Sequence, residues 1–301
     1  VEGITVAGRY AYVTSNSGAT LTVMDVSNVS LPTQVGQVSG LSGARGVVVS
    51  GRYAYVSNFN ASGGVYVIDI SNPSAPVLVN TITGGQVLNL SVFGKYLYVA
   101  NYGSNSISIY SLASPSAPTL TGTVGGMTTP TSITVSGNYA YVSTFASTAF
   151  YIVDVSNPAV PVVRGSLTGL TSSTSASVAV AGRYAYLMNN SRLYIVDVSS
   201  STAPVITAQV IDSGGGYPVS TVVSGRYVYV APHGSNSTVS IFDIGGLETN
   251  GATIASLEAG TAQIRNDLTV QGGIFTSALN AANAMIETLS AKIASFTSVV
   301  I

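Results

Sequence analysis

The sequence of 301 residues has no cysteine and very little charge. Without cysteine the chain cannot form disulfide staples, thiolate metal sites or a cysteine nucleophile. Charged residues make up only 7% of it, whereas about a quarter is typical of soluble domains. The ten basic residues nearly balance the eleven acidic ones. Because phosphate binding needs a basic stripe, we expect no nucleic-acid partner.

Residues that usually carry catalysis or bind metals are also scarce. The only histidine is His233, in a predicted loop, so we expect neither a His-carboxylate triad nor a multi-histidine metal site within one chain. The acidic residues outside the repeats match neither an EF-hand loop nor a pair of glycosidase carboxylates close in sequence. We therefore expect no catalytic residue, no metal and no cofactor. No run of eighteen apolar residues occurs, so we expect no membrane span in this chain.

What the sequence does contain is one short phrase, Gly-x-Tyr-x-Tyr, written six times. The copies begin at Gly8, Gly51, Gly94, Gly137, Gly182 and Gly225. Their spacings are 43, 43, 43, 45 and 43 residues. A fixed period of about 40 to 50 residues with strand-like content is typical of propeller repeats. The sequence therefore predicts an all-β, six-bladed β-propeller over residues 1–246.

The sequence of each repeat unit predicts four strands. In the second unit, two apolar, β-branched segments are separated by Gly51 and read as strands joined by a tight turn. Two more follow, with Pro73 and Pro76 in the turn between them, where a missing amide donor disrupts no strand pairing. The predicted strands are Gly46–Ser50, Tyr53–Ser57, Val65–Ile70 and Val77–Ile82. Four strands per unit make one propeller blade.

Two regular features of the repeat are interpreted as scaffold. The Tyr-x-Tyr strands are expected to pack between blades, with an aromatic ladder for sugar binding as the alternative. A basic and an acidic residue on neighbouring strands recur as Arg9 with Asp25, Arg52 with Asp69, Arg183 with Asp197 and Arg226 with Asp243. The pattern fails where Lys95 meets Ser111 and Asn138 meets Asp154. We interpret it as one cross-strand ion pair or turn-capping carboxylate per blade, and the alternative is a functional ring of charges around the axis.

The third strand of the unit carries a resemblance to a known family. Its sequence is Tyr66-Val-Ile-Asp69, Tyr151-Ile-Val-Asp154 and Tyr194-Ile-Val-Asp197 in three of the units. These segments resemble the LVIVD-repeat family over residues 1–246, whereas the third unit departs from the pattern with Ile107-Ser-Ile-Tyr-Ser111. The resemblance implies a β-propeller of bacterial or archaeal surface or secreted proteins, and it implies no catalytic residues.

The ends of the repeat array predict an incomplete last blade. The first unit begins directly at its innermost strand, Ile4–Ala7, and the sixth ends after its third strand, Val239–Ile244. An exposed strand edge invites pairing. We expect this edge to be covered by a segment near Ala252–Ser256, or by an extended segment of a neighbouring chain through strand addition.

The last part of the chain, residues 247–301, differs in sequence from the repeats. Apolar residues recur there at steps of three and four, namely Leu279, Ala282, Ile286, Leu289, Ile293, Phe296 and Val300. This spacing predicts a helix over about residues 278–298 with the heptad seam of a coiled coil. The segment is thus expected to be a mixed stalk that makes a homo-oligomer, either a trimer or a filament. The alternative is an amphipathic helix packed on the surface of its own propeller.

The loops that follow the second strands are candidates for recognition. They all open on one face of a propeller, and they differ in sequence between blades, which is where a repeated scaffold places binding. The candidate binding residues are Asn58, Phe59, Asn101, Tyr102, Phe145, Asn189 and His233.

Together these features predict a non-enzymatic extracellular structural or adhesion protein, secreted to the cell surface. Its propeller head would be assembled into a surface fibre or filament. The expected partners are further copies of the chain and a cell-surface or glycan ligand. One alternative is a viral tail fibre or receptor-binding spike, which uses the same head and stalk. Another is a propeller enzyme or ligand-binding protein, which predicts convergent carboxylates in the central channel.

Overall fold

The computed structural model describes residues 1–145, 149–170, 176–189, 192–211, 217–233 and 238–244. The chain divides into two units, Val1–Gly246 and Leu247–Ile301. The second unit lies outside the described residues, and with it the predicted helix over 278–298, its heptad residues and the segment Ala252–Ser256. The described residues form 23 strands and contain no helix long and apolar enough to cross a membrane.

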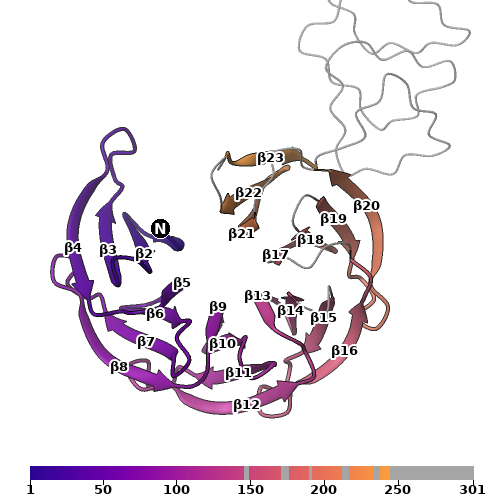
Figure 1. Ribbon diagram of the computed structural model, residues 1–301, viewed down its shortest axis with the longest axis horizontal. Coiled ribbons are helices and arrows are strands. Elements are labelled where there is room, and N and C mark those ends of the chain that lie inside the picture. The colour runs from indigo at the N-terminus through magenta and orange to yellow at the C-terminus, as the bar shows by residue number, and fades with distance from the viewer. Residues whose placement is uncertain (146–148, 171–175, 190–191, 212–216, 234–237, 245–301) are drawn as a thin grey trace, which may run out of the picture. The chain divides into compact units, whose positions relative to one another are not determined.

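The strands form six antiparallel sheets in chain order (Figure 1). Blade one is β1 (Gly3–Ala7), β2 (Tyr10–Ser15), β3 (Thr20–Asp25) and β4 (Thr33–Ser39). Blade two is β5 (Ala44–Ser50), β6 (Tyr53–Asn58), β7 (Gly64–Asp69) and β8 (Val77–Thr83). Blade three is β9 (Val87–Phe93), β10 (Tyr96–Asn101), β11 (Ser106–Ser111) and β12 (Thr119–Gly125).

The last three blades follow the same order. Blade four is β13 (Pro130–Ser136), β14 (Tyr139–Thr144), β15 (Phe150–Asp154) and β16 (Val162–Leu167). Blade five is β17 (Ala176–Ala181), β18 (Tyr184–Asn189), β19 (Arg192–Asp197) and β20 (Val205–Ile211). Blade six is β21 (Tyr217–Ser224), β22 (Tyr227–His233) and β23 (Ser240–Asp243), with three strands among the described residues.

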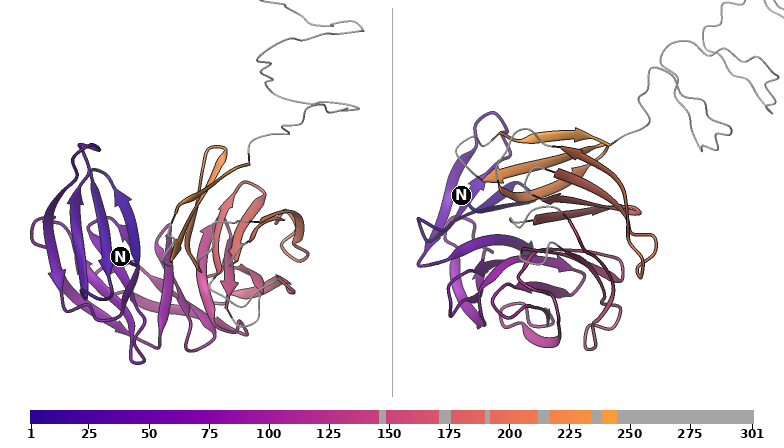
Figure 2. Two further views of the ribbon diagram at one scale, coloured as in Figure 1. Left: turned by 45° about the horizontal axis from the view of Figure 1, so that its top comes forward. Right: turned by 45° about the vertical axis from the view of Figure 1, so that its right-hand side comes forward.

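This arrangement confirms the predicted six-bladed β-propeller. The first strands of successive blades contact one another, from β1 with β5 to β17 with β21, and they lie toward the centre, while β4, β8, β12, β16 and β20 lie outermost (Figure 1). Tilted views show the sheets standing side by side around this centre (Figure 2). The hairpin turns between first and second strands therefore lie at one end of the ring. The loops between second and third strands lie at the opposite end. We call these the turn end and the loop end.

The glycine that opens each repeat phrase is required by the hairpin at the turn end. Ala7 pairs with Tyr10, so Gly8 and Arg9 form a two-residue turn. Gly8 has a φ of 60°, and its five counterparts have φ between 57° and 58°. A side chain disfavours this left-handed region, which is why glycine holds the first position of the turn in all six blades.

The core consists of five apolar layers, one between each pair of successive blades. The second tyrosine of the repeat phrase contributes to these layers in blades one to five, as predicted. Tyr55 is fully buried between blades two and three and donates a 2.8 Å hydrogen bond to the carbonyl of Pro115 in blade three. Burial raises the pKa of Tyr55 to about 12, so this phenol stays protonated and continues to donate.

The predicted ion pairs between neighbouring strands are present at the turn end. Arg9 pairs with Asp25, Arg183 with Asp197 and Arg226 with Asp243, and Arg52 pairs with Asp69 at 2.8 Å. Each of these arginines also lies over the first tyrosine of its phrase, as Arg52 does over Tyr53 at 5.2 Å from the ring centroid. The four pairs therefore belong to the scaffold, as expected.

Blade four lacks this pairing, as its sequence indicated. Asn138 stands at the arginine position there, and Asp154 pairs instead with Arg164 of the outer strand β16 at 2.8 Å. The hydroxyl of Ser156 also donates to Asp154 at 2.6 Å, and this bond together with the amide of Ser156 and Arg164 lowers the pKa of Asp154 to about 2. The carboxylate thus keeps a cationic partner from a different strand.

Glycines in the outer strands also allow neighbouring blades to approach closely at the outside of the ring. Gly36, Gly122 and Gly165 occupy the same position in the outer strands of blades one, three and four. A Cβ added to Gly122 would lie 2.3 Å from the carbonyl oxygen of Pro158, which belongs to the turn between the third and fourth strands of the next blade. The absence of a side chain therefore lets that turn cross the outer strand. In blade five the same position is Ala208.

Candidate functional site

The candidate binding residues lie at the loop end, but the three asparagines point their polar groups inward. Asn58 is 6% exposed, donates to the Tyr66 hydroxyl at 3.0 Å and accepts from the amide of Asn60. Asn101 is 8% exposed and donates to the hydroxyls of Ser106 and Ser108. Asn189 is buried as well. The amides of Asn58 and Asn101 therefore hold strand ends and loops of their own blades.

The aromatic candidates are placed differently. The rings of Phe59 and Tyr102, from neighbouring blades, meet edge to face with their centroids 5.2 Å apart. Both residues are half-buried and follow directly on β6 and β10. Phe145 is also half-buried and follows β14 in blade four. His233 ends β22, and its side chain lies outside the described residues. The structure thus brings together Phe59 and Tyr102 among the predicted residues.

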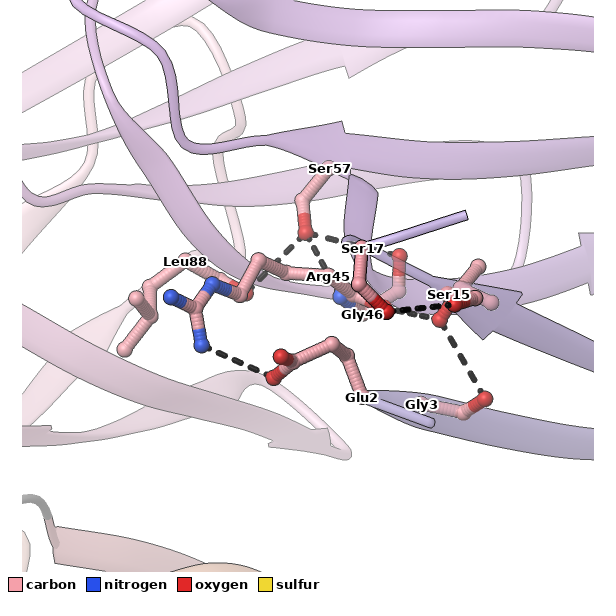
Figure 3. Close-up of polar contacts among 9 residues, drawn as sticks. Glu2, Gly3, Ser15, Ser17, Arg45, Gly46, Ser57 and Leu88 are labelled. Atoms are coloured by element: carbon pink, nitrogen blue, oxygen red, sulfur yellow. Dashed lines mark hydrogen bonds and ion pairs between the residues drawn. The ribbon is translucent and has the colours of Figure 1, made fainter. Parts of the chain in front are cut away.

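An ion pair that the sequence analysis did not select lies beside these rings. Arg45 donates to Glu2 through Nη1 at 2.8 Å and so links blade two to the start of the chain (Figure 3). The guanidinium carbon of Arg45 lies 5.1 Å from the centroid of the Phe59 ring, within the range of a cation–π contact. Arg45 Nε is buried and has no hydrogen-bond partner among the described residues.

The backbone around Arg45 is fixed by hydroxyl groups that bridge successive blades. Thr14 of blade one donates to the carbonyl of Arg45. One blade further, Ser57 donates to the carbonyl of Leu88 at 3.0 Å and accepts from the amide of Gly46 at 2.8 Å (Figure 3). Both hydroxyls are fully buried. The main chain that carries Arg45 is therefore held from both sides, so its side chain starts from a rigid position.

A glutamine completes this surface between blades two and three. Gln86 precedes β9 and donates through Nε2 to the carbonyl of Phe59 at 3.3 Å, while its own carbonyl accepts from the amide of Gly103 at 3.2 Å. It therefore joins the two loops that carry Phe59 and Tyr102. We call the set Glu2, Arg45, Phe59, Gln86 and Tyr102 the loop-end patch.

The signal for Glu2 and Arg45 was available in the repeat. The two residues occupy the same repeat position, 43 residues apart, and the third and fourth units have Leu88 and Thr131 there. Opposite charges at one repeat position of successive blades come close because the first strands of these blades are neighbours. Sequence reasoning missed the pair because it searched for charge that recurs in every unit, whereas this pair occurs once.

A second surface lies where the repeat array begins and ends. Ile4 and Val6 of β1 are 64% and 61% exposed, whereas Val47, the counterpart of Ile4 in blade two, is 6% exposed. Val47 packs in the layer between blades one and two. Ile4 therefore stands on the face that in blade two contacts a preceding blade.

Blade six shows the opposite face. Val239 and Ile241 are each 60% exposed, whereas Leu21 and Val23, which hold the same repeat positions in blade one, are fully buried. The ribbons of blades one and six stand apart in Figures 1 and 2. Among the described residues, β23 also has no strand on its outer edge. We call Val239, Ile241 and this edge the blade-six end.

These features define a β-propeller built from sequence repeats. The chain belongs to the LVIVD repeat family, whose model matches residues 1–39, 43–83, 84–126, 125–168, 173–212 and 215–244. The six matches coincide with the six blades, which confirms the resemblance seen in the third strands. No curated relative matches the sequence significantly.

Several solved structures are similar in fold. A protein of unknown function from Desulfotomaculum acetoxidans is 15% identical, with a TM-score of 0.70 over 81% of this chain and 82% of that one. A protein from Lactobacillus plantarum is 13% identical, with a TM-score of 0.69 over 79% of each chain. The periplasmic gluconolactonase of Pseudomonas aeruginosa is 18% identical, with a TM-score of 0.68 over 80% of each chain. At these identities the likeness concerns the fold alone.

Proposed function

We propose that this chain is a non-enzymatic structural protein that assembles outside the cell into a fibre or filament and presents the loop end of its propeller for adhesion. The blade-six end carries the proposal. Val239 and Ile241 lie exposed on a face whose counterparts in other blades are buried in a layer between blades, and β23 is the last strand of its sheet among the described residues. Exposed edges and large apolar surfaces are where chains associate.

Strand addition at β23 would give blade six the fourth strand that the other five blades have and that the described part of blade six does not include. A strand added there would pair with the backbone of β23 and cover apolar side chains beside it. The strand comes from a neighbouring copy in the assembled state. The predicted heptad residues between Leu279 and Val300 would hold the copies together through a coiled coil.

The amino acids of the central strands support a role without catalysis. None of the six first strands, which lie toward the channel, contains aspartate or glutamate. No group of three or more histidine, aspartate and glutamate residues that could hold a metal occurs in the described part of the chain. A hydrolytic propeller would be expected to place such groups together in its channel. The full chain should therefore show no hydrolysis of gluconolactone above a heat-denatured sample.

Sedimentation of the full chain and electron microscopy of the same sample test the assembly. We expect an oligomer or a filament, and we expect Val239→Asp with Ile241→Asp to shift the chain toward monomers, because a buried unpaired charge is unfavourable in an interface. Val77→Asp is the matched control, since Val77 is 54% exposed on the outer strand β8. A monomeric full chain, or equal assembly of all variants, would contradict the proposal.

The role of the tail is tested separately by ending the chain at Gly246. The proposal expects the shortened chain to be soluble and monomeric, because it retains all six blades and lacks the heptad residues. Assembly that persists in the shortened chain would show that the heptad segment is not what joins the copies.

A further inference from the structure

The loop-end patch combines two aromatic rings with polar and charged side chains. Its members come from separate segments: Glu2 before β1, Arg45 in β5, Phe59 after β6, Gln86 before β9 and Tyr102 after β10. Three blades therefore contribute to one surface. Convergence of chemically different side chains from several segments is typical of a binding site rather than of a repeated scaffold contact.

The apolar part is a continuous row of planar groups. The guanidinium of Arg45 lies over the Phe59 ring, and Phe59 meets Tyr102 edge to face. Because this contact is edge to face, with 66° between the rings, the two aromatic faces point in different directions. Both residues are half-buried, so their positions are fixed while part of each ring remains accessible. Such rings offer a rigid platform that loses little entropy when a ligand stacks on it.

The polar part presents donors and acceptors next to each other. The side chain of Arg45 is 31% exposed and that of Glu2 is 15% exposed, and one bond joins Arg45 Nη1 to Glu2 Oε2. A guanidinium has five N–H donors and a carboxylate has about four acceptor sites, so the pair retains unused capacity of both kinds. A hydroxyl group both donates and accepts, and it can therefore bridge the two side chains.

The charges of the patch disfavour ionic ligands. Arg45 and Glu2 neutralise each other, and the other ion pairs of the first three blades lie at the turn end. An anion would be attracted by Arg45 but repelled by Glu2, and the reverse holds for a cation. The patch is therefore matched to a neutral ligand with several hydroxyls and an apolar face.

We propose that the loop-end patch binds a neutral saccharide. A pyranose ring stacks its C–H face on Tyr102, with Phe59 beside it, while adjacent hydroxyls bond to Arg45, Glu2 and Gln86. This inference deepens the adhesive role proposed for the propeller head. The test of binding is independent of the test of assembly, because calorimetry measures binding and sedimentation measures assembly. Either proposal can therefore fail while the other holds.

Titration calorimetry of the full chain tests the site with defined probes. The neutral probes are maltohexaose, cellohexaose, chitohexaose and mannohexaose, and hexagalacturonate is the anionic probe. We expect at least one neutral probe to bind with a Kd of about 1 mM or tighter, and hexagalacturonate to bind more weakly. No binding of any neutral probe, or stronger binding of hexagalacturonate, would overturn the proposal.

Substitutions locate the site. Tyr102→Ala and Arg45→Gln should each weaken binding of the neutral probe at least about tenfold. Arg9→Gln is the matched control, because Arg9 also pairs with a carboxylate and lies over a tyrosine, but at the turn end. It should bind like the unchanged chain. Equal affinity in Tyr102→Ala and in the control would exclude the patch as the site.

A loss of binding must be separated from a loss of structure, because Arg45 links blades one and two. Thermal unfolding of each variant provides this check. If Arg45→Gln melts at a lower temperature, Gln86→Ala takes its place, since Gln86 contacts the ligand in the proposal and bonds only within the loops. A Gln86→Ala chain with unchanged melting and unchanged affinity would contradict the proposed hydroxyl contacts.

Discussion

Blade two and blade six follow the same repeat, yet they differ in what surrounds them. Blade two has neighbours on both faces and a fourth strand on its edge, and every residue of its second strand, β6, is buried. In blade six, Val239 and Ile241 are exposed, and β23 ends the described sheet. A propeller blade is therefore not stable by its own sequence alone. Its stability comes from the two neighbours that cover its faces, as in other repeat proteins.

The largest effect should come from truncating the same isoleucine in two blades. Ile109 and Ile241 occupy one repeat position, but Ile109 is fully buried and Ile241 is 60% exposed. Ile109→Ala should lower the free energy of unfolding by about 2–5 kcal/mol through lost burial and a cavity. Ile241→Ala should lower that of the monomer by less than about 0.5 kcal/mol.

Chemical denaturation at concentrations where the chain is monomeric measures both values. The difference between the two variants is the quantity of interest, because the residue and the repeat position are the same. Equal losses would mean that something buries Ile241 in the monomer, and the blade-six end would then not be a free surface.

A smaller loss is expected when a side chain is added between blades. In Gly122→Ala the new Cβ would lie 2.3 Å from the carbonyl oxygen of Pro158. This overpacking should lower the free energy of unfolding by about 1–3 kcal/mol. Blade five already has Ala208 at this position, so Ala208→Gly serves as the matched control and should change stability by at most about 1 kcal/mol. Melting temperatures of the two variants check the expectation, and an unchanged Tm for Gly122→Ala would contradict close interlocking.

Removal of one hydroxyl should have a still smaller effect. Tyr55→Phe keeps the buried ring but removes the hydrogen bond to the carbonyl of Pro115. The loss of this bond should lower the free energy of unfolding by about 0.5–1.5 kcal/mol. The loss rises to about 1–3 kcal/mol if the carbonyl is left without a partner. Tyr229, the corresponding residue of blade six, is half-buried, so Tyr229→Phe should change stability less. Denaturant titration of both variants measures the difference, and a larger loss for Tyr229→Phe would reverse the comparison.

The fold could be read from the sequence because it rests on features that recur. Gly8 and its counterparts, the buried tyrosines and the Arg9–Asp25 type of pair are repeated in register, so one correct unit predicts the others. The failure of the pattern at Asp154 was predicted, but its partner Arg164 was not, because no other described outer strand contains a basic residue.

The loop-end patch was only partly predictable, because its parts occur once each. Phe59 and Tyr102 were selected as unlike loop residues, but sequence alone could not show that their rings meet across two blades. Asn58 and Asn101 were selected by the same argument, and the structure buries their amides instead. Loop position predicts which residues reach the end of the ring, whereas side-chain direction depends on local hydrogen bonds such as that from Asn58 to Tyr66.

The smallest effect concerns pH, and it compares blade five with blade three. Hydrogen bonds from Arg183 and Ser199 lower the pKa of Asp197 from 3.8 to about 2, whereas Ser111 occupies this position in blade three. A carboxyl whose pKa is lower in the folded state stabilises the fold above its unfolded pKa. This contribution is lost as the pH falls from about 4 to about 2. Asp197→Asn should therefore reduce the fall in Tm across this window, while Ser111→Ala should leave the fall unchanged. An identical Tm profile for Asp197→Asn and the unchanged chain would mean that the exposed pair contributes nothing measurable, as many surface pairs do.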